Sequence, residues 1–292
     1  MSLLEDIKYR YTRLGFLGKL IAINSALFIV LYLIEYLFQN NIITRWLYLP
    51  KAFGDFFMQP WSIITYSFLH GDLLHLAFNM IGLYYIGRLF LSIYSEKRFL
   101  NVYFLGAIVG GCFFLLSYNI FPAFIQRTPP LVGASAAIMA ILIFTATIRA
   151  KMRVYIFNYG VELWKFGAFF VILDLIRIPM NDGANAGGFI SHLGGALLGY
   201  IYAKRLEKGS DIGSGFEKFM DTIVSYFTPK KKSPLKTVYK NKKTTSTAKT
   251  ATSSPTQKQR KIDGILDKIS KSGYESLTKE EKDFLFKAGK EN

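Results

Sequence analysis

The chain has 292 residues, of which 51% are hydrophobic and 16% aromatic, and its mean hydropathy is +0.24. This composition, with several apolar runs near the roughly 20 residues that a helix needs to cross a bilayer, predicts a polytopic membrane protein and excludes an ordinary soluble one. The net charge of +16 lies mostly in loops and in the C-terminal tail, so it indicates a membrane surface rather than nucleic acid as a partner. A single cysteine, Cys112, excludes a disulfide framework and a CxxC metal or redox site.

The N-terminal segment, residues 1–16, is polar and carries no cleavable signal, so we expect it to precede a retained first span. Lys and Arg in the short loops favour one side of the membrane by about thirteen to four, which places both termini in the cytoplasm. The sequence therefore predicts an all-α bundle of six transmembrane helices with a cytoplasmic basic tail. The predicted spans are 17–38, 69–91, 99–118, 133–148, 161–178 and 186–203.

The connection between the first two spans, residues 39–61, is long and unusually apolar. Its Trp, Leu and Phe side chains favour the headgroup boundary over water. We therefore expect this loop to lie in the outer interface of the membrane.

The fourth span is short. From Ser135 to Ile148 it rises only about 21 Å, against about 30 Å of hydrocarbon. Basic residues within 149–153 hold its C-terminal end at the cytoplasmic surface, and the pair Pro129–Pro130 blocks extension at the other end. Ser135 is therefore predicted to lie inside the membrane, where non-helical backbone is tolerated only within protein or beside a water-filled cavity.

The chain continues beyond the last span into a segment of different composition. Residues 230–261 hold eleven Lys or Arg and no acid, which predicts a disordered linker near anionic lipid. In the hairpin that follows, Gly273 can close the first helix, and Thr278 and Glu281 can form a capping box for the second. The predicted domains are 1–16, a six-span core at 17–205, an interfacial amphipathic helix at 206–229, the basic linker at 230–261 and a small helical hairpin at 262–292.

All three histidines, His70, His75 and His192, fall in or at the ends of predicted spans, where ionisable side chains are costly and are candidates for function. His75 and Asn79 are four residues apart on one helix face, so both can donate hydrogen bonds into one cavity. An interhelical hydrogen-bond pair is the alternative for these two. His70 is expected to brace the loop before the helix.

The sixth span carries a face made of glycine and one histidine: Gly188, His192, Gly195 and Gly199. Such a face lets another helix approach closely. The small residues of the fourth span, Gly133, Ala136, Ala137 and Ala140, are the expected partners. Ser135 and His192 are then expected to meet at hydrogen-bond distance, although packing alone also accounts for the small residues around Ser135.

A serine becomes a nucleophile beside a neutral imidazole, and its tetrahedral intermediate needs fixed hydrogen-bond donors. The free amides of a helix N-terminus at Ser135 can supply such donors, together with Asn79 and His75. Asp174 is predicted to pair with Arg177 at i+3, so we expect a Ser–His dyad rather than a triad. No HExxH motif is present, so we do not expect a zinc protease.

Three pieces of sequence, "PWSIITYSFLHGDLLHLAFNM", "GASA" and "SHLGGALLG", occur in this order. In them the chain resembles the rhomboid intramembrane serine proteases over about residues 16–205. The resemblance implies a six-helix bundle with a short fourth helix, Ser135 as nucleophile, and His192 as general base. It also implies that Asn79, His75 and the Ser135 backbone N–H form an oxyanion hole. By the same resemblance, single-pass transmembrane proteins are the expected substrates, and no metal or cofactor is expected. The residues expected to support the site are His70, Trp61, Gly133, Gly195, Gly199 and Met139.

The chain departs from the family pattern at three positions. Ala136 replaces the usual glycine after the serine, which we expect to matter little. Ser62 replaces the arginine that usually follows the tryptophan, here Trp61, so we expect a less firmly braced loop. Met139 replaces a tyrosine that packs on the histidine, although its sulfur can still contact the ring.

Two other functions are weighed against the protease. A catalytically inactive relative would bind transmembrane clients, and a small transporter would need an internal repeat or broken helices that the sequence does not show. The family analogy suggests a bacterial plasma membrane.

Overall fold

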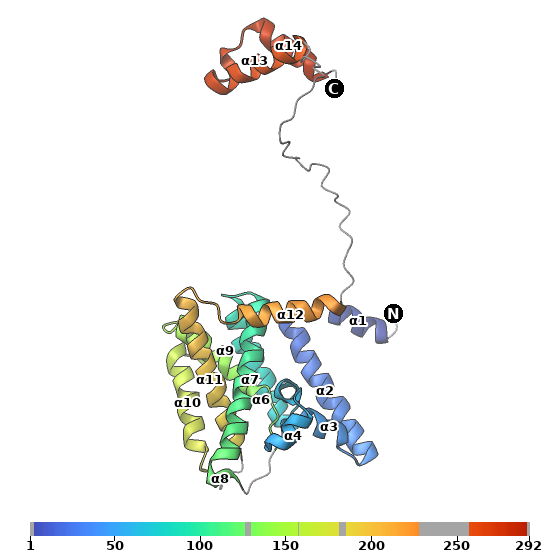
Figure 1. Cartoon of the computed structure of the whole chain (residues 1–292), viewed down its shortest axis with the longest axis vertical. Coiled ribbons are helices and arrows are strands. Elements are labelled where there is room, and N and C mark those ends of the chain that lie inside the picture. Colours follow the sequence, from blue (N-terminus) through green and yellow to red (C-terminus); the bar gives the residue numbers. More distant parts are fainter. Residues whose placement is uncertain (1–2, 126–129, 157, 181–184, 228–256, 291–292) are drawn as a thin grey trace, which may run out of the picture. The chain divides into compact units, whose positions relative to one another are not determined.

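The computed structural model describes residues 3–125, 130–156, 158–180, 185–227 and 257–290. The chain divides into two compact units, Met1–Lys230 and Lys231–Asn292 (Figure 1). The elements of the first unit are α1 (Leu3–Arg13), α2 (Phe16–Phe38), α3 (Ile42–Leu47), α4 (Phe53–Met58), α5 (Ser62–Thr65), the 3-10 turn η1 (Tyr66–Phe68), α6 (Leu73–Leu91), α7 (Glu96–Ile120), α8 (Pro122–Ile125), α9 (Ser135–Ile148), β1 (Arg153–Ile156), β2 (Tyr159–Glu162), α10 (Leu163–Arg177), α11 (Ala186–Glu207) and α12 (Ser214–Phe227). Those of the second are α13 (Gln257–Ser272), the 3-10 turn η3 (Tyr274–Ser276) and α14 (Lys279–Lys290).

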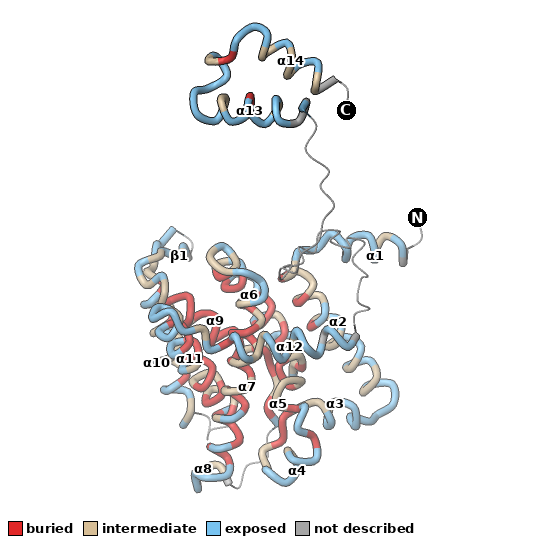
Figure 2. Tube along the Cα trace, turned by 45° about the horizontal axis from the view of Figure 1, so that its top comes forward, coloured by how far each residue is buried: buried red, intermediate tan, exposed pale blue. Residues whose placement is uncertain are grey.

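The first unit is an all-α membrane bundle built around α9. This helix packs against α6, α7, α10 and α11, and most of its residues are buried (Figure 2). The surrounding helices bury one side and leave large apolar side chains exposed on the other, as Val30 of α2, Phe78 of α6 and Ile172 of α10 show. Among the described residues, α2, α6 and α7 are long and apolar enough to cross a membrane.

Each of the six predicted spans coincides with one helix of the bundle: α2, α6, α7, α9, α10 and α11. The second begins four residues later than predicted, at Leu73, because Asp72 caps α6 by accepting a hydrogen bond from the backbone N–H of His75 at 2.8 Å. The fourth is the short α9, 14 residues long, as its sequence predicts.

One feature of the fold was not predicted: a β-hairpin between α9 and α10. Strands β1 and β2 pair antiparallel from Arg153 opposite Glu162 to Ile156 opposite Tyr159. Each strand has four residues, and the sequence of this segment shows too little alternation to indicate the hairpin.

The apolar loop between α2 and α6 is braced, although Ser62 stands where the family pattern has arginine. The indole N–H of Trp61 donates to the Trp46 carbonyl at 2.8 Å, and the two rings stack with centroids 5.8 Å apart. Thr65 Oγ1 donates to the Leu47 carbonyl at 2.6 Å. These two bonds tie the loop to α3, whereas the buried Oγ of Ser62 has no hydrogen-bond partner among the described residues. The effect of Ser62 on the firmness of the loop stays a prediction.

Helix α12 is tied to one end of the bundle. Lys97 at the start of α7 forms ion pairs with Glu217 at 3.3 Å and Asp221 at 3.2 Å. Phe216 packs against Phe104 of α7 with ring centroids 6.1 Å apart, whereas Phe219 is exposed. Helix α12 lies within the segment 206–229 that is predicted as an interfacial amphipathic helix, and one of its apolar side chains faces the bundle.

The second unit is a pair of helices. Gly273 ends α13 with a left-handed φ of +78°, which favours glycine. Glu281 accepts from the backbone N–H of Thr278 at 2.8 Å, and Thr278 Oγ1 accepts from the Glu281 N–H at 3.3 Å, so the predicted capping box is confirmed. Helix α13 begins at Gln257, so residues 257–261 belong to the hairpin and not to the predicted linker; residues 228–256 lie outside the described part of the chain.

Candidate active site

Ser135 is the first residue of α9, and the strand-like segment before it is firmly anchored. Leu131 and Leu49 exchange two backbone hydrogen bonds of 2.9 and 3.1 Å, and both side chains are buried. Gly133 N–H donates to the Tyr66 carbonyl at 3.0 Å. The anchor thus lies in the loop before α6; Pro129 of the predicted proline block lies outside the described residues.

Gly133 lets the chain pass beside the catalytic candidates. Its φ is +120°, a conformation that side chains rarely adopt. A Cβ built on it would stand 2.7 Å from His75 Nε2 and 3.5 Å from Ser135 Oγ. These two atoms therefore border the same small space, and only glycine leaves that space open.

The contacts of His75 determine its tautomer. The Gly71 backbone N–H donates to His75 Nδ1 at 3.3 Å, so the proton of the neutral ring is on Nε2. Because Nε2 borders the space beside Gly133 that Ser135 Oγ also borders, His75 presents an N–H donor to that space.

Asn79 lies one turn further along α6 and is buried. Its Nδ2 donates to the His75 carbonyl at 2.9 Å, and its Oδ1 has no hydrogen-bond partner among the described residues. An amide nitrogen carries two protons, so this bond leaves one N–H of Asn79 for a further acceptor.

The helices that carry the serine and His192 touch through small residues. A Cβ on Gly195 would clash with the carbonyl oxygen of Ala136, and one on Gly199 with that of Ala140. The predicted contact between the glycine face of α11 and the small residues of α9 is therefore confirmed for these two glycines. Gly188 does not take part, because its nearest atoms belong to Asn185 of the same helix region.

Helix α7 makes room for Ala136. A Cβ on Gly110 would lie 2.7 Å from the Ala136 methyl and 2.7 Å from the Ser191 carbonyl oxygen. The methyl after the serine is thus accommodated where α7 has glycine.

His192 lies on α11 and contacts Asp174, which was predicted to pair with Arg177 instead. Its Nδ1 is 3.1 Å from Asp174 Oδ2, and the side chains are only 19% and 7% exposed. The predicted pairing of Asp174 with Arg177 is wrong: the Arg177 guanidinium lies over the Phe189 ring, 5.7 Å from its centroid. A carboxyl in an otherwise apolar helix is a sign of function, and it could have indicated the role of Asp174 from the sequence. The arginine at i+3 suggested a local partner instead, but the tertiary packing does not bring the two together.

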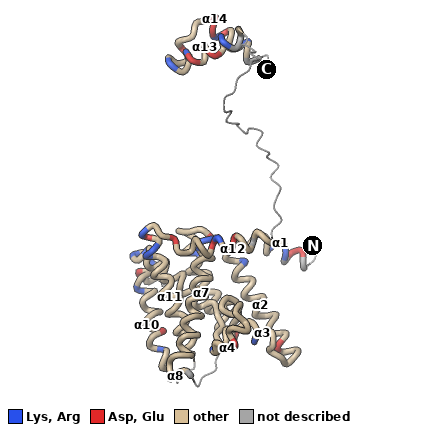
Figure 3. The backbone as a smooth tube through the Cα atoms, viewed as in Figure 1, with Lys and Arg blue, Asp and Glu red and all other residues tan. Residues whose placement is uncertain are grey.

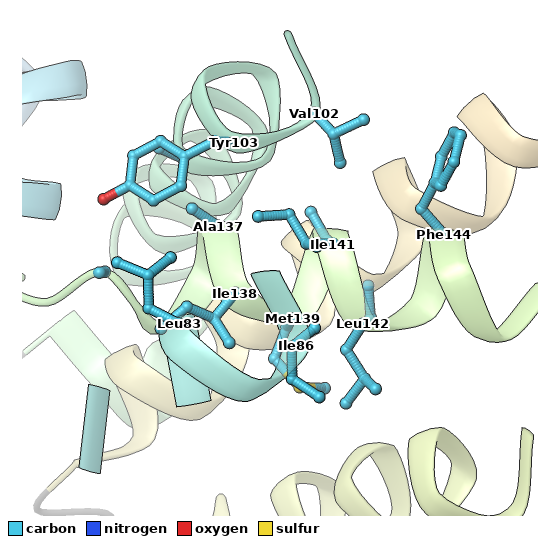
Figure 4. Close-up of a cluster of buried hydrophobic side chains, with 14 of the residues drawn as sticks. Leu83, Ile86, Val102, Tyr103, Ala137, Ile138, Met139, Ile141, Leu142 and Phe144 are labelled. Carbon is cyan, nitrogen blue, oxygen red and sulfur yellow. The ribbon is translucent and has the colours of Figure 1, made fainter. Parts of the chain in front are cut away.

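Two residues expected to support the site have unexpected surroundings. Both ring nitrogens of His70 are buried without a hydrogen-bond partner among the described residues, and its ring lies edge-on to His75 with centroids 5.3 Å apart. His70 therefore braces the other histidine by ring packing. Met139 belongs to the apolar cluster that Figure 4 shows with Ile86 and Leu142.

Helix composition and this geometry define a polytopic membrane protein with serine and histidine on adjoining helices. The model of the Rhomboid domain matches residues 58–208, so the chain belongs to the rhomboid family. Residues 253–288 match a family of unknown function, DUF6576.

Several named relatives match part of the chain. The chain is 31% identical to RHOMBOID-like protein 12, mitochondrial, of Arabidopsis thaliana, over 51% of this chain and 47% of that one. It is 29% identical to Rhomboid-like protease 3 of Toxoplasma gondii, over 53% and 56%. It is 25% identical to Rhomboid protease GlpG of Haemophilus influenzae, over 66% and 95%. The chain spans about half the length of the first two of these relatives.

The names of the relatives bear on location. They include mitochondrial and chloroplastic proteins as well as bacterial ones. The chain is an integral membrane protein, but these names do not support the expected assignment to a bacterial plasma membrane.

Proposed function

We propose that the chain is an intramembrane serine endopeptidase that cleaves transmembrane segments of membrane proteins, with Ser135 as nucleophile and His192 as general base. The observation that carries the proposal is the backbone contact between Gly195 and Ala136. Ser135 precedes Ala136, and His192 lies one turn before Gly195 on the same face of α11. This contact therefore supports a site in which the two side chains lie at the same level of the bundle.

In the proposed reaction, Ser135 Oγ attacks the scissile carbonyl carbon while its proton passes to His192 Nε2. The C–N bond then breaks, and the same proton goes to the leaving amine. Water next attacks the acyl-enzyme, giving one proton to His192, and the acid product leaves as Ser135 recovers its proton. No metal or cofactor takes part in these steps.

The charge on the tetrahedral oxygen would be held by donors that are already in place. His75 Nε2–H faces the space beside Ser135, and Asn79 has an N–H beyond its bond to the helix. No side chain caps the first turn of α9 in the described structure, so its backbone amides, including that of Ser135, are available as well.

We further propose that the end of the bundle that carries α12 faces the cytoplasm. Lys and Arg gather at this end of the first unit and are sparse at the end that carries α8 (Figure 3). This asymmetry agrees with the positive-inside rule, and both termini would then be cytoplasmic. The basic stretch within 228–256 is proposed to bind anionic lipid.

The test uses purified protein, a fluorophosphonate probe and a reporter substrate with one transmembrane segment. Wild type should be labelled and should cut the reporter, whereas Ser135→Ala and His192→Ala should do neither. Ser117→Ala is the matched control, because Ser117 is also on a bundle helix and, among the described residues, its hydroxyl bonds to its own helix at the Phe113 carbonyl. If wild type neither reacts nor cuts but still binds the reporter, the chain is an inactive client-binding relative, a kind that also occurs among its matches.

A further inference from the structure

We propose that Asp174 is a positioning residue that orients and polarises His192, so that this chain uses an Asp–His–Ser arrangement. The proposal rests on the proposed protease function. Its basis is the 3.1 Å contact between Asp174 Oδ2 and His192 Nδ1, which joins α10 to α11. Both side chains are largely buried.

The surroundings of Asp174 give the carboxyl no other charged partner among the described residues. Arg177, one turn away, packs over Phe189 instead. The same helix exposes Ile172 and Ile176 toward the lipid side, whereas Asp174 is buried toward α11. An ionisable group in an apolar segment is costly and is retained where it has a task.

The contact determines which nitrogen of His192 can act as base. An ionised carboxylate only accepts hydrogen bonds, so Nδ1 must carry the proton that it donates to Asp174. The lone pair is then on Nε2, the position that must take the Ser135 proton. When Nε2 is protonated, the carboxylate stabilises the imidazolium without taking the proton, which continues to the leaving amine.

In the described part of the chain, Met139 and Phe189 do not orient the His192 ring from a second helix. The residue four positions after the serine, Met139, is buried in the apolar cluster with Ile86 and Leu142 (Figure 4). The aromatic neighbour of the imidazole is Phe189 of the same helix, edge-on with centroids 6.1 Å apart. Phe189 and His192 belong to the same helix, so their contact does not hold the ring from a neighbouring helix. Among the described contacts, the Asp174 carboxylate on α10 does so.

The experiment separates positioning from packing. Asp174→Asn keeps the size of the side chain and can keep a hydrogen bond between α10 and α11. It loses the charge, and its amide can donate to Nδ1 and so trap the wrong tautomer. Asp174→Glu keeps the charge on a longer stem. Asp55→Asn, an exposed position on α4, is the matched control. For each purified variant, kcat, KM, fluorophosphonate labelling rate and thermal stability are measured with the reporter substrate.

We expect Asp174→Asn to lower kcat by about 10²–10⁴-fold with KM and thermal stability little changed, and the labelling rate to fall in parallel. Asp174→Glu should recover part of the rate. Wild-type kcat in Asp174→Asn would overturn the positioning role while leaving the protease intact. A wild type that neither cuts nor reacts would overturn the proposed function and this role together.

A second measurement does not depend on turnover or on a foldable variant. In proton NMR of the wild type, an imidazole N–H bonded to a buried carboxylate gives a far-downfield resonance. We expect one such resonance that disappears in His192→Ala. Its absence from the wild type across the active pH range would overturn the proposal.

Discussion

The carbonyl oxygen of Ala136 occupies the place that a side chain on Gly195 would need, so α9 and α11 touch backbone to backbone. The contact stands beside Ser135 on one helix and one turn from His192 on the other. Packing and proposed chemistry are therefore coupled, because any residue that separates these helices also separates the nucleophile from its base.

Gly195→Ala tests this coupling. The added methyl has no space, so we expect overpacking to lower stability by about 1–3 kcal/mol and the displaced dyad to lose about 10²-fold in kcat. Reporter cleavage and thermal unfolding measure the two effects. Gly54→Ala is the control, since nothing lies within 4 Å of its added Cβ. Equal behaviour of both variants would show that the helices can move apart freely.

Gly133→Ala tests the space between His75 and the serine. The φ of +120° strains any other residue by about 1–3 kcal/mol, and the new methyl would press on His75 Nε2. We expect kcat to fall by a larger factor than the yield of folded protein. Gly82→Ala adds its methyl at an ordinary 3.5 Å from Ile138 and should leave cleavage near the wild-type rate. An active Gly133→Ala would argue against the oxyanion role of His75.

Asn79→Ala tests the proposed oxyanion hole. Loss of one donor should lower kcat by about 10²–10³-fold and leave KM nearly unchanged. Asn24 on α2 is a close match, because its Nδ2 also donates to the carbonyl four residues back, at 2.9 Å, and its Oδ1 is also buried without a partner. Asn24→Ala should therefore lower stability as much as Asn79→Ala does but leave kcat unchanged. A similar fall in kcat for both would assign Asn79 to packing.

Asp211 accepts hydrogen bonds from Arg98 of α7 and Tyr202 of α11. Its ionisation should therefore make the free energy of unfolding depend on pH. Burial opposes its ionisation, but hydrogen bonds from Tyr202, Arg98 and the Gly213 amide outweigh burial and hold the pKa of this carboxyl below its ordinary value. A depressed carboxyl pKa contributes stability above the unfolded value of 3.8, and that contribution is lost as pH falls through the folded pKa.

Asp211→Asn should therefore lower stability at pH 7 by about 1–3 kcal/mol, and the difference from wild type should shrink as pH falls below about 4. Thermal unfolding in detergent at a series of pH values measures it. Asp6→Asn, which removes an exposed ion pair with Arg10, should change stability by less than about 1 kcal/mol at either pH. A pH-independent effect of Asp211→Asn would contradict the ionised hydrogen-bond network.

Local patterns predicted the local features well. The length of the apolar runs indicated the bundle helices, and the short fourth helix followed from the distance between Ser135 and the basic residues that end it. The capping box at Thr278 and the closing Gly273 also needed only neighbours in the chain. The β-hairpin at β1 and β2 and the brace from Trp61 to Trp46 were not foreseen, because backbone partners in a loop leave little trace in side-chain patterns.

The sequence by itself determined the family, the helices and the small-residue face, since these depend on composition and on spacing along one helix. Only the tertiary structure decided the partner of Asp174. Arg177 is its neighbour on α10, but packing turns the carboxyl toward His192 of α11 and the guanidinium toward Phe189. A choice between two partners depends on how two helices are rotated against each other, and that rotation is set by all their contacts together.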